Sequence, residues 1–122
     1  MKILVIDDDV ISRKVITHKI NESLAKAHVD TFIEPKLFYE SDKVKDILTY
    51  DAIISDYTFP TETCIPFLKY LKEEASYTKL IIVLSGDEEE EIIENLSDYP
   101  NTKCFNKQNE SFDKIIELLK EL

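Results

Sequence analysis

Short apolar runs alternate with amphipathic stretches along this 122-residue chain. The apolar runs have strand length and predict strands at residues 2–6, 28–33, 52–54, 80–84 and 103–105. The run at 28–33 alternates polar and apolar side chains, which is typical of an edge strand, whereas the continuous runs indicate strands buried on both faces. Strand–helix order repeated five times predicts an α/β fold, a doubly wound five-stranded parallel sheet between two helix layers.

The stretches between these runs carry apolar residues at helical spacing. They predict helices from about Val10, after Thr63, over 87–96 and over 111–122, while residues 36–50 are less regular and offer Ser41 as an N-cap. The residues expected on the buried sides are Ile11, Val15, Ile16, Ile20, Leu24, Val44, Ile47, Leu48, Ile65, Phe67, Leu68, Leu71, Ile92, Ile93, Leu96, Phe112, Ile115, Ile116, Leu118, Leu119 and Leu122.

Polar side chains of a particular kind follow four of the predicted strands. Asp7 and Asp8 follow the first, Asp56 ends the third, Ser85 follows the fourth and Lys107 follows the fifth. The carboxyl ends of parallel strands lie along one edge of the sheet, where ligands bind at the switch point of the winding. Each residue alone has an ordinary explanation, such as a cap or a surface charge, but their coincidence on one edge predicts a site.

The residue types at this edge suit phosphoryl transfer. Three carboxylates repel one another and raise at least one pKa unless a cation lies among them. Oxygen ligands without His or Cys favour a hard ion, above all Mg²⁺. Lys107 adds a positive charge and Ser85 a hydroxyl donor, which an incoming phosphoryl group needs. Asp56, at the end of a central strand, is the best candidate for a nucleophile that forms an aspartyl phosphate.

Composition and charge narrow the other possibilities. A net charge of −10 and the lack of a basic cluster disfavour direct nucleic-acid binding. Gly86 is the only glycine, which excludes glycine-rich dinucleotide loops and P-loops. No apolar run reaches the ~18 residues of a membrane span and the start turns acidic too early for a signal peptide, so we expect a cytoplasmic protein without membrane contact. Cys64 and Cys104 fit neither a disulfide framework nor a metal-ligand spacing.

Four parts of the sequence resemble the response-regulator receiver domains of two-component signalling: residues 3–8 (ILVIDD), 56–60 (DYTFP), 84–86 (LSG) and Lys107. The resemblance extends over the whole chain and implies a single receiver domain at residues 1–122. It implies a flavodoxin-like three-layer sandwich with strand order 2-1-3-4-5. It further implies that Asp56 accepts a phosphoryl group from a histidine kinase or a phosphotransfer protein.

The same resemblance implies roles for the other residues of the site. Asp8 would be a direct Mg²⁺ ligand, Asp7 would act largely through metal-bound water, and the backbone carbonyl of Thr58 would be a further ligand. Ser85 would turn its hydroxyl toward the phosphoryl group, and Lys107 would pair with it. An output or effector protein would bind the surface formed by residues 87–96, the last strand and the final helix. The acidic run at 87–91 favours a basic partner surface.

The sequence departs from the family near the last strand. Gln108 follows Lys107 where the family has a proline in a cis peptide. Because a cis bond without proline costs about 2.5–4 kcal/mol, we expect a trans bond and an altered loop. Cys104 occupies the position of the family's aromatic switch residue, and the neighbouring Phe105 is expected on the opposite face of the strand.

Two further departures from the family lie elsewhere in the chain. Thr63-Cys64 replaces the usual Asp-Gly, and Thr58 and Asp87 occupy positions that tune dephosphorylation in the family.

Two other functions stay open. The departures at the last strand motivate a phosphorylation-independent protein-binding module with a receiver fold. A third possibility is a phosphatase that turns over through an aspartyl phosphate, although Thr58 stands where a second acid would assist. Phosphorylation of Asp56 separates the first two functions, and multiple turnover on small phosphate esters would identify the phosphatase.

Overall fold

The computed structural model describes residues 1–86 and 89–122, and the side chains at 89–91 and 109 lie outside that description. Its five parallel strands are β1 (Lys2–Ile6), β2 (His28–Phe32), β3 (Ala52–Asp56), β4 (Leu80–Ser85) and β5 (Thr102–Asn106). Their order in the sheet is β2-β1-β3-β4-β5. This confirms the predicted α/β class, the five parallel strands and the order 2-1-3-4-5.

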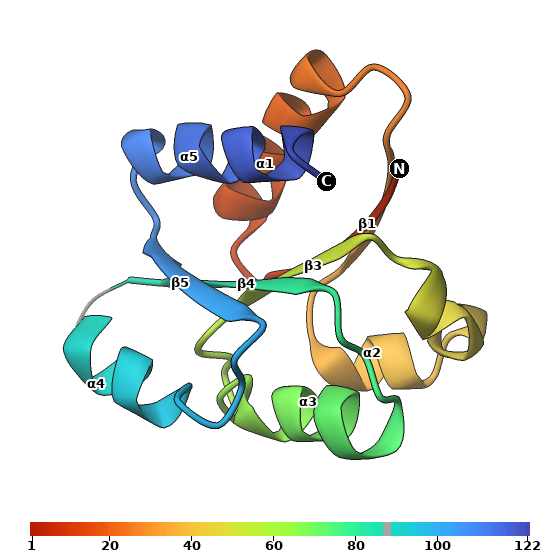
Figure 1. Cartoon of the computed structure of the whole chain (residues 1–122), viewed down its shortest axis with the longest axis vertical. Coiled ribbons are helices and arrows are strands. Elements are labelled where there is room, and N and C mark those ends of the chain that lie inside the picture. The colour runs from red at the N-terminus through yellow and green to blue at the C-terminus, as the bar shows by residue number, and fades with distance from the viewer. Residues whose placement is uncertain (87–88) are drawn as a thin grey trace.

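Helices cover both faces of the sheet, as Figure 1 shows. On one face lie α1 (Val10–Ser23) and α5 (Asn109–Lys120), and on the other lie α2 (Pro35–Tyr39), α3 (Ile65–Lys69) and α4 (Glu89–Asn95). The central strands β1, β3 and β4 are almost wholly buried, whereas the outer strands β2 and β5 are only partly covered. The alternating pattern at 28–33 therefore predicted an edge strand correctly.

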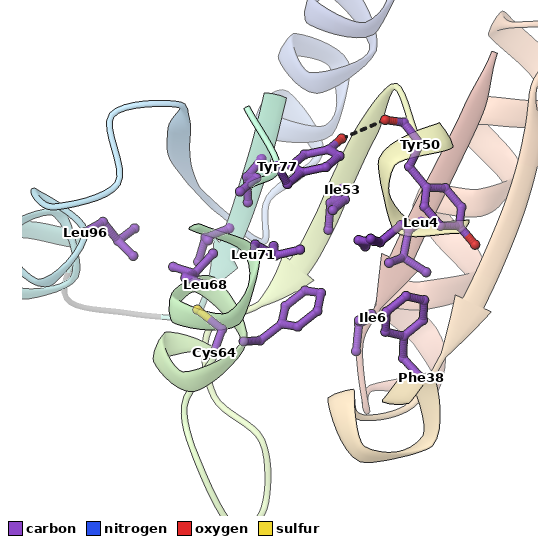
Figure 2. Packing of buried hydrophobic residues seen from close by; sticks show 14 of the residues in the cluster. Leu4, Ile6, Phe38, Tyr50, Ile53, Cys64, Leu68, Leu71, Tyr77 and Leu96 are labelled. Carbon is purple, nitrogen blue, oxygen red and sulfur yellow. Dashed lines mark hydrogen bonds between the residues drawn. The ribbon is translucent and has the colours of Figure 1, made fainter. Parts of the chain in front are cut away.

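Alternate residues of the strands enter two separate cores, because successive side chains point to opposite faces of a sheet. Leu4 and Ile6 pack toward α2 and α3, while Ile3 and Val5 pack toward α1 and α5. Figure 2 shows the first of these cores. Within it the hydroxyl of Tyr77 donates a 2.9 Å hydrogen bond to the backbone carbonyl of Tyr50. This bond satisfies a polar group that would otherwise be buried without a partner.

Local capping explains where several helices begin. Asp9 is the N-cap of α1 and accepts a hydrogen bond from the backbone of Ile11. Ser41 caps a 3₁₀ helix, η1 (Asp42–Thr49), as predicted. The hydroxyl of Thr63 accepts a 3.3 Å bond from the backbone of Ile65, although the N-cap residue of α3 is the following Cys64. The irregular region 36–50 is thus resolved into the short α2 and η1.

The end of α3 has a feature that the sequence pattern did not predict. It continues as a π-helix, η2 (Tyr70–Glu74), and the backbone of Ala75 donates to the carbonyl of Tyr70. The backbone of Tyr77 then donates a 2.8 Å bond to the carbonyl of Leu71. Between them Ser76 adopts a left-handed conformation with φ of 54°. This arrangement ends the helix with a tight reversal that usually has glycine at the left-handed position.

Most of the residues expected on the buried sides are at least partly buried, but the prediction is wrong for four of them. More than half of the surface is exposed in Ile11, Leu48, Ile93 and Leu122. Ile11 lies in the first turn of α1, and Leu48 lies in a 3₁₀ helix, whose tighter period moves it off the buried side. Ile92 is buried, and the next residue in α4 is turned about 100° away from it. Leu122 lies beyond the end of α5.

The predicted helix at 87–96 corresponds to α4, and its first two residues lie outside the described part of the chain. Among the described helices, none combines the length and the apolar character needed to cross a membrane.

Candidate functional site

Three carboxylates meet where β1 and β3 end. Asp7, Asp8 and Asp56 each offer an oxygen within 4.8 Å of the others. Asp7 is 1% exposed and Asp56 6%, whereas Asp8 is exposed to solvent. Because β1 and β3 are hydrogen-bonded neighbours, the residues that follow them arrive together at one edge of the sheet. The clustering predicted for these three residues is therefore found.

Backbone hydrogen bonds hold the two strand ends in place. The backbone of Asp7 donates a 3.0 Å bond to the carbonyl of Phe32 in β2, and its Oδ1 accepts a 2.9 Å bond from the backbone of Asp9. The residue after Asp56, Tyr57, donates a 2.8 Å backbone bond to Leu84 in β4. Both carboxylates thus sit on backbone that is anchored to a neighbouring strand.

Lys107, just beyond β5, reaches into this cluster. Its Nζ lies 3.2 Å from Asp56 Oδ2 and 3.3 Å from Asp7 Oδ2. Its backbone donates a 3.0 Å bond to the carbonyl of Ser85, which fixes the start of the loop. One partly buried ammonium group is therefore shared by two buried carboxylates, and the charge of the third carboxylate has no such partner among the described residues.

Ser85 and Thr58, the two other predicted site residues, are placed differently. Ser85 ends β4 and is 2% exposed, and its hydroxyl is buried without a hydrogen-bond partner among the described residues. Thr58 is exposed two residues after Asp56 and forms an isolated bridge with Thr63 across the loop. Its side chain makes no hydrogen bond to the three carboxylates in the described structure, and the role predicted for its carbonyl stays a prediction.

The electrostatics of the cluster agree with the predicted repulsion. Burial raises the pKa of Asp56 to about 7, the charge of Asp7 adds to the shift, and Lys107 opposes it. Burial also raises the pKa of Asp7 above its ordinary value, against the hydrogen bond from Asp9 and the charge of Lys107. For Lys107, burial lowers the pKa, but the charges of Asp56 and Asp7 outweigh it and the net pKa is raised. Burial, more than repulsion, is the largest cause for both carboxylates.

The donor set suits a hard divalent cation. All candidate ligand atoms are carboxylate oxygens. Mg²⁺ prefers a site with few protein ligands, because it keeps several of its bound waters. The Oδ2 atom of Asp7 is buried and accepts no hydrogen bond in the described residues, although Lys107 is within ion-pair distance. An oxygen in this position gains a partner when a cation binds.

Arg13 is a residue of the site's surroundings that was not among those predicted from the sequence. Its Nη1 donates a 2.8 Å bond to the backbone carbonyl of Asp7. The only sequence signal is its place four residues after the N-cap, Asp9, so that it rises from the first turns of α1 beside the end of β1.

The structure shows how the residues that depart from the family near the last strand are placed. The Lys107–Gln108 peptide is trans, as expected. Cys104 packs against the core under α3 and α4, whereas Phe105 packs against the core under α1 and α5, so the two lie on opposite faces of β5. The expectation for these residues is confirmed. Asp87, named among the tuning positions, lies outside the described residues.

Comparison with known proteins adds information on the fold. No family model matches the chain, and no curated protein sequence matches it. Among solved structures it is similar to the chemotaxis protein CheY4 of Vibrio cholerae, with a TM-score of 0.76, 20% identity, and coverage of 98% of this chain and 96% of that one. It is also similar to the signal receiver domain of the DNA-binding response regulator MerR of Colwellia psychrerythraea, with a TM-score of 0.79, 16% identity, and coverage of 100% and 99%.

A third similar structure is a response-regulator receiver domain from Rhodospirillum rubrum, with a TM-score of 0.75, 19% identity, and coverage of 98% of this chain and 90% of that one. All three structures align over nearly the whole of this chain. The fold of this chain is that of the response-regulator receiver domains.

Proposed function

We propose that residues 1–122 act as one receiver domain, which accepts a phosphoryl group on Asp56 from a histidine kinase or a phosphotransfer protein. The observation that carries the proposal is the position of Lys107, whose Nζ is 3.2 Å from Asp56 Oδ2 inside a cluster of three carboxylates. A buried carboxylate beside a fixed cation at the switch point of an α/β sheet has the surroundings that phosphoryl transfer needs. The shared receiver fold supports the same conclusion.

In the proposed reaction a carboxylate oxygen of Asp56 attacks the phosphorus of a phosphohistidine. An O–P bond forms as the P–N bond breaks, and the imidazole nitrogen keeps the electron pair and takes up a proton. Lys107 then pairs with the phosphoryl oxygens, which replaces part of its present contact with Asp56. The unpartnered hydroxyl of Ser85 donates a hydrogen bond to the same group.

Mg²⁺ would be held by Asp8 and Asp56, with Asp7 acting through bound water and the carbonyl of Thr58 as a further ligand. Bound there, it would neutralise negative charge on the transferring phosphoryl group. The fit rests on the all-oxygen donor set and on the buried Oδ2 of Asp7, which accepts no hydrogen bond in the described residues.

The output surface in this proposal is formed by α4, β5 and α5. A groove of about 490 Å³ lies between α4 and β5, and its lining includes Ile93, Leu96, Tyr99, Cys104 and Phe105. Ile93 is 57% exposed and offers an apolar contact to a partner. The acidic run at 87–91 of the sequence favours a partner with a basic surface, so binding should weaken as salt is added.

Intact-mass spectrometry tests the proposal. Wild-type protein and Asp56→Asn are incubated with Mg²⁺ and phosphoramidate, and a parallel sample contains a chelator. We expect one added phosphoryl group on the wild type only, and none in the chelated sample. A folded, Mg²⁺-binding wild type that gains no phosphoryl group would contradict the proposal.

Cys104 gives one specific reason to keep a second candidate function. It stands on the α4 side of β5, where the family has an aromatic switch residue, and Phe105 faces the other way. A binding module that keeps this fold without phosphorylation control would bind its partner equally well before and after treatment with phosphoramidate. Repeated turnover of a small phosphate ester would instead identify a phosphatase.

A further inference from the structure

Helix α1 and the edge strand β2 border a groove of about 340 Å³. It is lined by Arg13, Lys14, Thr17, His18, Asn21 and Thr31. All six side chains can donate a hydrogen bond and none of them is acidic, in a chain with 25 acidic and 15 basic residues. A groove of this character is suited to an anion, since hydrogen-bond donors and positive charge face the same space.

The arrangement follows from helix and strand periodicity. Arg13, Thr17 and Asn21 are spaced four residues apart, so they form one row along α1. Thr31 pairs in register with Val5, whose side chain belongs to the core under α1, so Thr31 lies on that face of β2. The neighbouring Asp30 points to the opposite face, where its Oδ2 accepts a 2.6 Å bond from Tyr50. The acidic residue of this strand is thereby kept out of the groove.

A second observation points to a ligand. The Oγ1 atom of Thr17 is buried and has no hydrogen-bond partner among the described residues. Buried hydroxyls without a partner are uncommon, because each loses its bond to water without gaining another. The oxygen has almost no accessible surface, so an oxyanion in the groove would accept a hydrogen bond from this hydroxyl once the Thr17 side chain turns toward the groove.

Arg13 is already oriented by the protein. Its Nη1 donates a 2.8 Å bond to the carbonyl of Asp7, and the guanidinium group carries five donors in all. Planar guanidinium groups bind phosphate through paired hydrogen bonds, so a pre-oriented arginine lowers the ordering cost of binding. His18 is not held toward the groove in this way, because its Nε2 lies 3.0 Å from Glu22 Oε1. The positive charge of the groove comes from Arg13 and Lys14.

We propose that the α1–β2 groove binds a phosphate-type oxyanion. Arg13 and Lys14 supply the positive charge, and the side chains of Thr17, Asn21 and Thr31 donate hydrogen bonds. The oxyanion is either free inorganic phosphate or a phosphorylated side chain, which share this chemistry. Because Arg13 also bonds to the carbonyl of Asp7, occupancy of the groove is linked to the backbone that carries the acidic cluster.

The test is an amide-detected NMR titration of the whole chain in metal-free buffer with a chelator. Inorganic phosphate is added at constant ionic strength, and sodium chloride serves as the reference. We expect saturable shifts at the amides of Lys14, Thr17, Asn21 and Thr31. Equal shifts with chloride, or shifts confined to the surroundings of Lys107, would overturn the proposal. A parallel titration with O-phosphoserine separates the sources: tighter binding indicates a phosphorylated side chain, and weaker binding indicates the free ion.

Two variants and a matched control sharpen the test. Lys14→Gln should weaken phosphate binding about tenfold, because a charge-assisted contact is lost. Thr17→Val keeps the shape of the side chain and should weaken binding several-fold, with an unchanged amide spectrum in the absence of phosphate as evidence of folding. Lys26→Gln removes the same charge from the loop after α1, outside the groove, and should leave binding unchanged. Equal weakening by Lys14→Gln and Lys26→Gln would show general charge screening and overturn the proposal.

Discussion

The ammonium nitrogen of Lys107 lies 3.2 Å from a carboxylate oxygen of Asp56. The two residues come from the ends of β5 and β3, which are separated in the sheet by β4. The same nitrogen is 3.3 Å from Asp7, so a single cation faces two buried carboxylates. Because one positive charge faces two negative ones, keeping both carboxylates ionised costs free energy of folding.

Asp56→Asn should stabilise the metal-free protein at alkaline pH. Burial, followed by the charge of Asp7, raises the pKa of Asp56 from 3.8 to about 7, so the folded protein holds this proton more tightly than the unfolded chain. The associated stability is fully present below about pH 4 and is lost as the pH rises through about 7. We expect Asp56→Asn to exceed wild type by about 2–4 kcal/mol at pH 8, and by much less near pH 4. Urea unfolding at both pH values measures this.

Mg²⁺ provides the control for that experiment. Adding it at pH 8 should stabilise the wild type and narrow its gap to Asp56→Asn, because a ligand that binds only the folded state shifts unfolding. A gap between the two proteins that does not change with pH would contradict the proposed origin of the effect.

Lys107→Gln should destabilise the metal-free protein at pH 8. The substitution removes the cation between Asp7 and Asp56 and leaves two buried carboxylates facing each other. Loss of one member of a buried ion pair costs about 3–5 kcal/mol. The double variant with Asp56→Asn should recover most of this loss, since only one of the two paired carboxylates is then left. Denaturant unfolding of the four proteins in this cycle gives the coupling free energy, and strictly additive effects of the two substitutions would argue against the shared ion pair.

Tyr50→Phe should cost stability at neutral pH and less in acid. The Tyr50 hydroxyl donates a 2.6 Å bond to Asp30 Oδ2. Burial raises the pKa of Asp30, but the hydrogen bonds from Tyr50 and His28 outweigh it, and the net pKa is lowered. The stability that the ionised carboxylate contributes is present above about pH 4 and is lost as the pH falls through the folded-state pKa. We expect a loss of about 1.5–3 kcal/mol at pH 7, measured by thermal or urea unfolding.

Tyr77→Phe is the matched control for Tyr50→Phe. It also removes one buried hydroxyl, but that hydroxyl donates to a backbone carbonyl rather than to a carboxylate. Its cost of about 1 kcal/mol should not depend on pH between 3 and 7. The same pH dependence in both variants would rule out Asp30 as the cause.

Ser76→Gly should stabilise the protein. Ser76 has φ of 54° at the turn that ends η2, a conformation that penalises residues with a Cβ atom. The side chain is exposed, so little packing is lost. We expect a gain of about 0.5–1 kcal/mol in the free energy of unfolding. Ser76→Ala keeps the Cβ atom and should give no gain, and an equal gain in both variants would show that the backbone conformation is not responsible.

Much of the fold could be predicted because its signals are local. The runs at 2–6 and 80–84 are continuous and apolar, since central strands of a parallel sheet are covered on both faces. The regions that resisted prediction have weak or mixed periods: residues 36–50 became α2 and a 3₁₀ helix, and Tyr70–Glu74 became a π-helix. In these segments the packing against the sheet, and not the period of the sequence, selects the helical form.

The residues at the strand ends could be identified from the amino-acid sequence alone, because a strand stops where a charged side chain replaces the apolar run. This was enough to bring together Asp7, Asp8, Asp56 and Lys107 on one edge. The contacts that cross between elements become visible only in the folded protein. They include the bond of Arg13 to the carbonyl of Asp7 and the bond of Tyr50 to Asp30. Such contacts depend on the register of the strands and the rotation of the helices. A shift of one residue would send the side chains of a strand to the opposite face and would turn those of a helix by about 100°.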